Sequence, residues 1–274
     1  MHALVIAGLL SFFKPAPPPP GLQVPQGAEV PQAPVQIRQS GRYDYAGKIY
    51  VLGKMPPVVR EYGTPALQVF ADKVLVRNFA WRGSMESLHV GSQEFNGRGM
   101  RERHQPIAVT LERLFCDDIG EDGISIQPRA KVTLRDSQFR GQYGRVRGEG
   151  ENPGQDKIVQ VDGATLKIEH CDFFNGRSPI RGKANSTILV RNCNFIRCGT
   201  CVSGDGVQNP NGNGHPPYDN GQPGPCRIVV EDCECWDCQE VARAFPGCTI
   251  ELRRVKLHRT WRMQRLSGGT VILR

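Results

Sequence analysis

The chain has 274 residues, 39% of them hydrophobic, and a formal net charge of +8. This hydrophobic content is enough to build a core, which excludes a chain that is disordered throughout. A basic surface attracts anionic partners such as nucleic acid, acidic polysaccharide or anionic lipid. Lysine and arginine are spread along the chain and no nucleic-acid-binding motif occurs, so we expect no nucleic acid partner.

The N-terminal segment differs in composition from the rest of the chain. Residues 1–13 contain an apolar run that is too short for a membrane span of roughly 20 residues but suits the core of a signal peptide. No lysine or arginine precedes this run, so an uncleaved peptide that docks the protein to a membrane or a larger assembly is an open alternative. Residues 14–39 are rich in proline and predict a stiff linker or a disordered tail. We therefore place the folded domain at residues 40–274.

Short segments with alternating apolar and polar residues predict β-strands along this domain. Examples are "KVLVRNF", "KVTLRDSQF" and "STILVRNCNF", which are separated by segments rich in glycine, asparagine and proline. No apolar pattern keeps a helical period for long. The sequence therefore predicts an all-β protein.

An internal repeat connects these strands. One set of apolar residues defines equivalent positions: Val76, Leu111, Leu134, Ile168, Val190, Val230 and Leu252. The residues three positions further on are Phe79, Leu114, Ser137, Cys171, Cys193, Cys233 and Val255. The residues five positions further on are Trp81, Cys116, Phe139, Phe173, Phe195, Cys235 and Leu257. Ser137 is the one polar residue among these later positions.

The spacing of the repeat predicts the architecture. The intervals 111 to 134, 168 to 190 and 230 to 252 are 22 or 23 residues long, and the other intervals contain insertions. Coils of this length, whose inward side chains stack on like side chains in the next coil, are typical of a parallel β-helix. A β-sandwich does not require matched residues at matched positions. We therefore predict a β-helix with long loop insertions.

The ten cysteines fall into two groups. Five lie at stacking positions, where we expect buried thiols: Cys116, Cys171, Cys193, Cys233 and Cys235. The other five lie in or near predicted turns, and an oxidising compartment would favour disulfides among them: Cys198, Cys201, Cys226, Cys238 and Cys248. Zinc binding by "CGTC" and "CECWDC" is a minor alternative.

Carboxylates gather in "FCDDIGEDGISIQP", residues 115–128. Glu121 follows Leu111 by ten residues, just as Glu86 follows Val76, so we expect the two glutamates to stack on strands about 4.8 Å apart. Such stacking is repulsive unless a cation compensates it. With Asp122 beside them, these oxygen ligands suit Ca²⁺. Salt bridges to basic residues, without chemistry, are the alternative.

Cations follow the carboxylates along the same predicted edge. The next coil brings Lys157, and the one after it brings Arg177 and Arg181. In order, these segments read "PALQVFADKVLVRNFAWRGSMESLHV", "VTLERLFCDDIGEDGISI", "DKIVQVDGATLKIEHCDFF" and "GRSPIRG". They resemble successive blocks of the polysaccharide lyase family 3 pectate lyases, and the resemblance covers roughly Pro65 to Asp205.

The resemblance implies a right-handed, single-stranded parallel β-helix and a calcium-dependent lyase that cleaves polygalacturonate by β-elimination. It implies calcium ligands at Glu86, Glu121 and Asp122. It also implies a catalytic Lys157, with Arg181 as the clamp on the substrate carboxylate and Arg177 nearby. The reverse assignment of base and clamp to Lys157 and Arg181 stays open. Burial and neighbouring cations can lower the pKa of a lysine, whereas arginine keeps its proton.

The sequence also departs from the family pattern. Glu86 stands where the family has an aspartate, and the family block "GKLYRSCGNC" is reduced to "GRSPIRGKANST". Our first hypothesis is a secreted or surface-tethered lyase acting on an acidic polysaccharide. Our second is a non-catalytic β-helix spike or adhesin that binds anionic surface glycan within a larger assembly, for example a virion.

Overall fold

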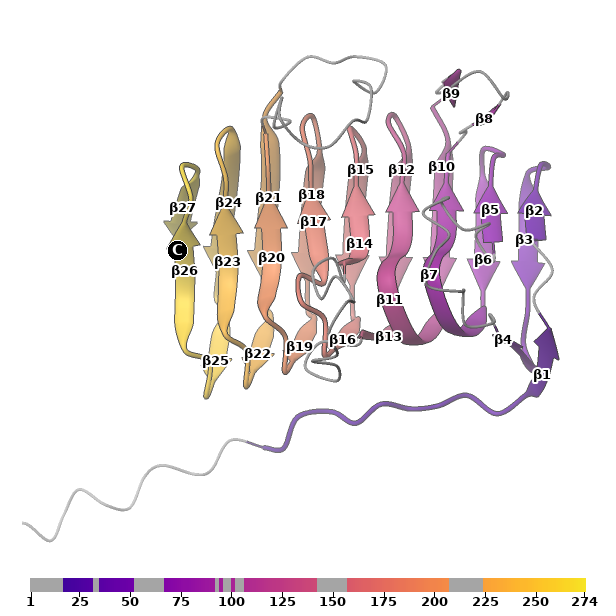
Figure 1. The fold of residues 1–274 in the computed structure, drawn as a ribbon, viewed down its shortest axis with the longest axis horizontal. Helices are drawn as coiled ribbons and strands as arrows, with labels where there is room; N and C mark the ends of the chain where they lie inside the picture. Colours follow the sequence, from indigo (N-terminus) through magenta and orange to yellow (C-terminus); the bar gives the residue numbers. More distant parts are fainter. Residues whose placement is uncertain are drawn as a thin grey trace, which may run out of the picture.

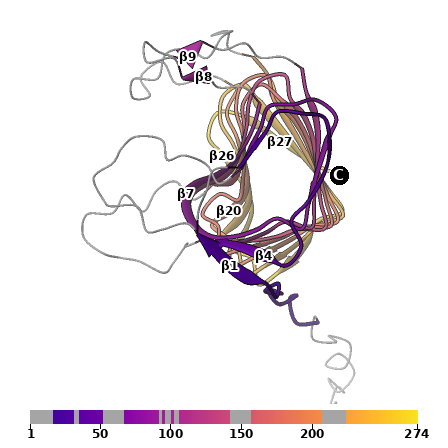
Figure 2. The same ribbon diagram turned by 90° about the vertical axis from the view of Figure 1, so that its right-hand side faces the viewer.

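The computed structural model describes residues 17–31, 35–51, 67–91, 94–95, 100–101, 106–141, 157–206 and 224–274. In these residues the chain forms strands without helices and winds repeatedly around one axis (Figures 1 and 2). Successive coils stack along this axis from the N-terminal end to the C-terminal end (Figure 1). None of the described residues belongs to a helix that is long and apolar enough to span a membrane.

One wall of the coil is a parallel sheet of nine strands. In chain order these are β3 (Gly41–Asp44), β6 (Val74–Arg77), β10 (Ala108–Glu112), β12 (Lys131–Arg135), β15 (Thr165–Glu169), β18 (Thr187–Arg191), β21 (Cys226–Glu231), β24 (Cys248–Arg253) and β27 (Thr270–Leu273). Each strand of this wall pairs in register with the strand of the next coil.

A sheet of sixteen strands forms the rest of the coil. The strands that follow the nine-stranded wall include β13 (Gln138–Gly141), β16 (Asp172–Phe174), β19 (Asn194–Ile196), β22 (Glu234–Trp236) and β25 (Lys256–His258). The strands that complete these coils are β14 (Lys157–Val161), β17 (Ile180–Gly182), β20 (Thr200–Gly204), β23 (Glu240–Ala244) and β26 (Arg262–Leu266).

Two long strands, β7 (Ala80–Val90) and β11 (Phe115–Ile126), join both parts of the sixteen-stranded sheet. The first coils add β1 (Ala28–Pro31), β2 (Val35–Ile37), β4 (Lys48–Val51) and β5 (Leu67–Val69). A separate antiparallel pair consists of β8 (Glu94–Phe95) and β9 (Met100–Arg101).

The predicted stacking positions are confirmed. From Val76 to Leu252, each residue of the first equivalent set is the register partner of the next. The set extends by one coil at each end, to Tyr43 and Leu273. The set that runs from Trp81 to Leu257 is likewise in register.

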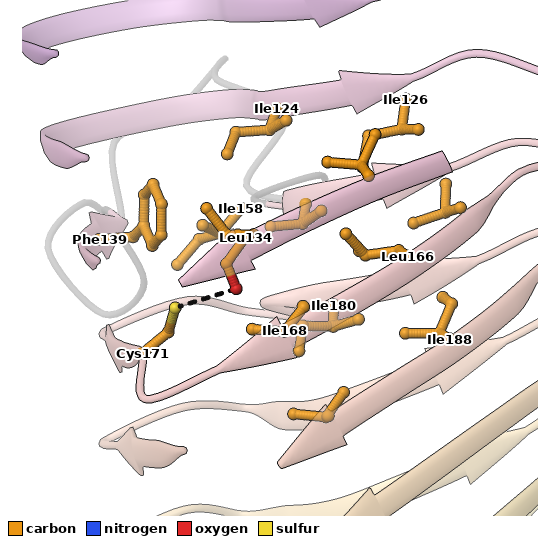
Figure 3. Packing of buried hydrophobic residues seen from close by; sticks show 14 of the residues in the cluster. Ile124, Ile126, Leu134, Phe139, Ile158, Leu166, Ile168, Cys171, Ile180 and Ile188 are labelled. Atoms are coloured by element: carbon orange, nitrogen blue, oxygen red, sulfur yellow. Dashed lines mark hydrogen bonds between the residues drawn. The ribbon is translucent and has the colours of Figure 1, made fainter. Parts of the chain in front are cut away.

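Like side chains stack on like side chains in the interior. The rings of Phe139, Phe173 and Phe195 are nearly parallel, with centroids 5.6 and 5.2 Å apart. All three are fully buried. Ile124, Leu134 and the other labelled residues of Figure 3 fill the adjacent interior. This continuous core allows loops to be inserted without breaking the stack.

A sharp turn follows each inner strand of the nine-stranded wall. The first residue after each of these strands has a left-handed backbone, with φ between 48° and 56°. These residues are Asn78, Arg113, Asp136, His170, Asn192, Asp232 and Arg254. In four of these turns the next residue is Ser137, Cys171, Cys193 or Cys233, whose side chain donates to the carbonyl two residues earlier. Ser137 Oγ donates to the Arg135 carbonyl at 2.7 Å, and Cys193 Sγ donates to the Arg191 carbonyl at 3.2 Å. A serine therefore replaces a cysteine in the stack without leaving a buried polar group unsatisfied.

The five cysteines that we placed outside the stack are in fact inside the coil. All ten cysteines are buried and free. Cys226 and Cys248 are register partners, and the sulfur of Cys201 lies 3.7 Å from that of Cys235. The disulfide expectation is therefore wrong for this structure. No group of three or more metal ligands occurs among the described residues, so the zinc alternative gains no support.

We expect all ten cysteines to be alkylated when the protein is denatured without a reductant, and almost none to react in the folded protein. Burial raises the pKa of the Cys193 thiol well above its ordinary value, so this group stays protonated as well as shielded. Mass spectrometry after iodoacetamide treatment measures the number of alkylated cysteines in the denatured and in the folded protein. A denatured chain that lacks alkyl groups in pairs would contain a disulfide and contradict this expectation.

The segment predicted as a linker takes part in the fold. β1 and β2 pair with β4 and β5, so strands begin before the expected domain start at residue 40. Upstream of them, Leu22 packs on two outer apolar clusters, which include Phe115 and Trp236. The backbone N–H of Gln23 donates to the side chain of Gln138 at 2.7 Å. The predicted apolar peptide, residues 1–13, lies outside the described residues.

Candidate active site

The predicted edge of carboxylates and cations lies on consecutive strands of the sixteen-stranded sheet. Asp122 of β11 is the register partner of Glu86 on β7 and of Lys157 on β14. The predicted stacking of Glu121 on Glu86 is therefore wrong. The register shifts between Ile119 and Asp122, where β11 has one residue more than β7. This bulge brings Asp122 into the position that equal spacing assigns to Glu121.

The donor set at this edge is chemically suited to calcium. Two glutamates and an aspartate on adjoining strands supply only hard oxygen ligands, which Ca²⁺ prefers. The side chains of Glu86, Glu121 and Asp122 lie outside the described part of the structure. Calcium binding by these residues therefore stays a prediction.

Asp117, an earlier carboxylate of the same acidic stretch, has a structural role. It is 6% exposed and accepts two hydrogen bonds of 2.6 Å from the guanidinium of Arg140 on β13. Arg82 on β7 lies 3.9 Å from it. A buried carboxylate paired in this way is compensated by the chain itself. Asp117 is therefore not a candidate metal ligand.

Lys157 occupies a polar network on the outer side of β14. It is 7% exposed, and its Nζ donates to Gln160 Oε1 at 2.8 Å. Gln160 Nε2 donates to Asp162 at 3.4 Å, and Lys183 Nζ donates to the same Asp162 oxygen at 3.2 Å. The other oxygen of Asp162 is buried without a hydrogen-bond partner. The network fixes the amine of Lys157 and leaves one acceptor unused.

The two predicted arginines take different places. Arg181 on β17 is the register partner of Gln160 on β14 and of Ser203 on β20, and it is half-buried. Arg177 is exposed in the turn before β17, where its carbonyl accepts the Thr200 N–H at 2.8 Å. The structure thus brings Arg181, but not Arg177, into the row next to the Lys157 network.

The row continues beyond the predicted residues. Ser203 pairs in register with Arg243 on β23, and Arg243 with Arg265 on β26. Glu240 is 4% exposed, accepts Thr200 Oγ1 at 2.5 Å and pairs with Arg243. Three arginines therefore lie along one line of the outer face, and a buried carboxylate holds the middle one.

Sequence reasoning missed Asp162, Lys183, Glu240 and Arg243. The available signal was charge complementarity at the coil period, because Asp162 and Lys183 are one coil apart and their charges are opposite. For Glu240 and Arg243 the signal was an acidic and a basic residue three positions apart in a predicted strand. Neither signal is specific without knowledge of the register.

Comparison with protein families agrees with the geometry of the coil. A family model described as "Right handed beta helix region" matches residues 105–254, which is more than half of the chain. Comparison with curated proteins finds no match. The prediction of an all-β, right-handed parallel β-helix is confirmed.

Proposed function

Since the chain belongs to the right-handed β-helix family, we propose that it acts on an acidic polysaccharide lying across the outer face of β14, β17 and the strands that follow. We propose further that it is a calcium-dependent lyase that cleaves a polygalacturonate-like polymer by β-elimination. The supporting observation is the position of Lys157, a buried amine held by Gln160 and one strand away from the guanidinium row that begins at Arg181.

Each residue has a chemical role in this proposal. Lys157 takes the C5 proton of a uronate, the electron pair forms the C4–C5 double bond, and the C4–O bond breaks. The leaving oxygen takes up a proton from solvent. Burial of an amine disfavours its charged form, and the neutral form is the one that accepts a proton. Arg181 binds the carboxylate on which negative charge accumulates.

Calcium would add to this stabilisation. Glu86, Glu121 and Asp122 would hold the ion, which would neutralise charge on the uronate carboxylate. The residues that the chain itself supplies still decide where the proton goes and how the sugar is oriented.

The test is a rise in ultraviolet absorbance from the unsaturated product, measured with polygalacturonate and related acidic glycans. We expect a rise with Ca²⁺ and none with a chelator. A neutral glycan serves as the control, because it has no carboxylate to acidify the C5 proton. If no acidic glycan is cleaved with Ca²⁺ present, the lyase proposal fails.

A second candidate function is binding without cleavage, as in a spike or adhesin for anionic glycan. The row Arg181, Arg243 and Arg265 favours it, because it extends beyond the Lys157 network. If the protein binds without cleavage, we expect Arg243→Gln to lower the affinity for the glycan. We also expect the wild-type protein to produce no rise in product absorbance. Equilibrium binding, measured by calorimetry beside the absorbance assay, separates the two functions.

A further inference from the structure

A second candidate site lies on the opposite wall, the nine-stranded sheet. A groove with a volume of about 660 Å³ crosses the outer face of five consecutive strands, from β3 to β15. Its lining includes side chains from every one of these strands. None of the residues discussed above for polysaccharide cleavage takes part in it.

The floor of the groove is one row of register partners. The row is Arg42, Leu75, Thr110, Thr133 and Lys167. A cation stands at each end, and between them lie half-buried residues with hydroxyl or aliphatic side chains. Neighbouring strands are about 4.8 Å apart, so the row offers hydroxyl donors and acceptors at a regular spacing along the coil axis.

The charges of the groove have one sign. The cations that line it are Arg42, Lys73, Lys131, Arg135 and Lys167, and the lining contains no carboxylate among the described residues. Arg135 and Lys167 have ion-pair partners in Glu112 and Glu169. For Arg42, Lys73 and Lys131, no ion pair occurs with any described residue. Three cations are therefore left uncompensated around one groove.

The adjacent row of the same sheet shows how this fold compensates charge. It alternates along eight coils as Asp44, Arg77, Glu112, Arg135, Glu169, Arg191, Glu231 and Arg253. Ion pairs of 2.8, 2.8 and 2.6 Å join Arg77 to Asp44, Arg135 to Glu112 and Arg191 to Glu231. Arg135 also lowers the pKa of Glu112, chiefly by a hydrogen bond. Arg42, Lys73 and Lys131 lie outside this alternating row, so they are available to a ligand.

We infer that the groove binds a linear anionic polysaccharide that runs along the coil axis across β3 to β15. The ligand's carboxylates or sulfates would meet Lys73, Lys131 and the end cations, and its hydroxyls would meet Thr110 and Thr133. No aromatic side chain lines the groove among the described residues, so the stacking platform that single-stranded nucleic acids use is missing. This binding does not depend on elimination chemistry.

The test is the affinity for oligogalacturonate, measured by calorimetry with chelator present so that calcium plays no part. Lys73→Gln with Lys131→Gln is expected to weaken binding about fivefold. The matched control is Lys48→Gln with Arg197→Gln, which removes the same charge from exposed positions that lie outside the groove and have no ion pair with a described residue. Equal losses in both double variants would show diffuse attraction and overturn the proposal. Equally tight, equally groove-dependent binding of single-stranded DNA would overturn the polysaccharide assignment.

Covalent cross-linking of the ligand to nearby lysines provides an independent test. A carbodiimide activates the ligand's carboxylates, which then form amides with lysines that they touch. We expect Lys73, Lys131 and Lys167 to be labelled, as identified by mass spectrometry of the wild-type protein. Labels confined to Lys157 and Lys183 would place the ligand only at the proposed active site. This result would overturn the proposal of a second binding site in the groove, but it would be consistent with the proposed function.

Discussion

Replacing Lys157 by alanine is expected to lower the rate of uronate elimination by about 10²–10⁴-fold, the range for removal of a general base. Lys157 is buried, and its Nζ donates to Gln160 at 2.8 Å, so its amine is fixed in place. Lys157→Arg should not restore activity, because a guanidinium does not give up its proton at neutral pH. The measurement is the initial rate of product absorbance at saturating calcium.

Two control variants separate chemistry from structure. Lys183→Ala removes another lysine from the same network, where it donates to Asp162, and it should cause a smaller loss. Lys48→Ala removes an exposed lysine of β4 and should leave the rate unchanged. Thermal unfolding of all variants checks that the fold is kept. A Lys157→Ala protein that folds and retains the wild-type rate would exclude Lys157 as the base.

The interior of the coil was predictable from the sequence because it repeats. Stacking requires an apolar side chain at the same position of each coil, so residues such as Leu134 and Ile168 mark the register directly. Ser137 looked like an exception, yet its hydroxyl donates to the Arg135 carbonyl as the cysteine thiols do at equivalent positions. The repeat is therefore a pattern of small donors as well as of apolar side chains.

The outer face was less predictable because counting residues between equivalent positions in the sequence does not detect a β-bulge. Equal spacing from Val76 and Leu111 pairs Glu86 with Glu121, but the extra residue of β11 pairs Glu86 with Asp122 instead. A bulge costs the core nothing as long as inward residues return to register, as Ile124 does. No apolar pattern reveals the bulge, so the sequence placed the carboxylates on adjoining strands but one residue out of register.

The sequence did not predict the cationic groove, and the reason differs from that for the bulge. A charged residue on a strand signals an outward side chain, but it does not reveal whether the next coil supplies a partner. Arg191 and Lys131 look alike in sequence, and only the register shows that Arg191 meets Glu231 whereas Lys131 lies in the groove. The proposed ligand groove therefore depends on cations that have no oppositely charged partner on the next coil, and the sequence does not reveal these.

Phe173→Ala is expected to destabilise the protein by about 3–5 kcal/mol, the usual cost of removing a buried phenylalanine. Phe173 is fully buried between the parallel rings of Phe139 and Phe195, whose centroids lie 5.6 and 5.2 Å away. Because each coil contacts only its neighbours, other coils cannot close the cavity. Phe173→Leu keeps most of the volume and should cost much less. Chemical denaturation of each variant gives the free energy of unfolding.

The neighbouring residue provides the matched control for this prediction. Phe174 lies on the same strand, β16, but packs in the outer cluster with Ile196 and Trp236. Outer side chains can shift toward solvent, so Phe174→Ala should cost less than Phe173→Ala. The loss at Phe173 should also speed amide hydrogen exchange in β17, the next strand of that coil, which carries Arg181. A larger cost at Phe174 would mean that the outer cluster, rather than the stacked interior, holds these coils together.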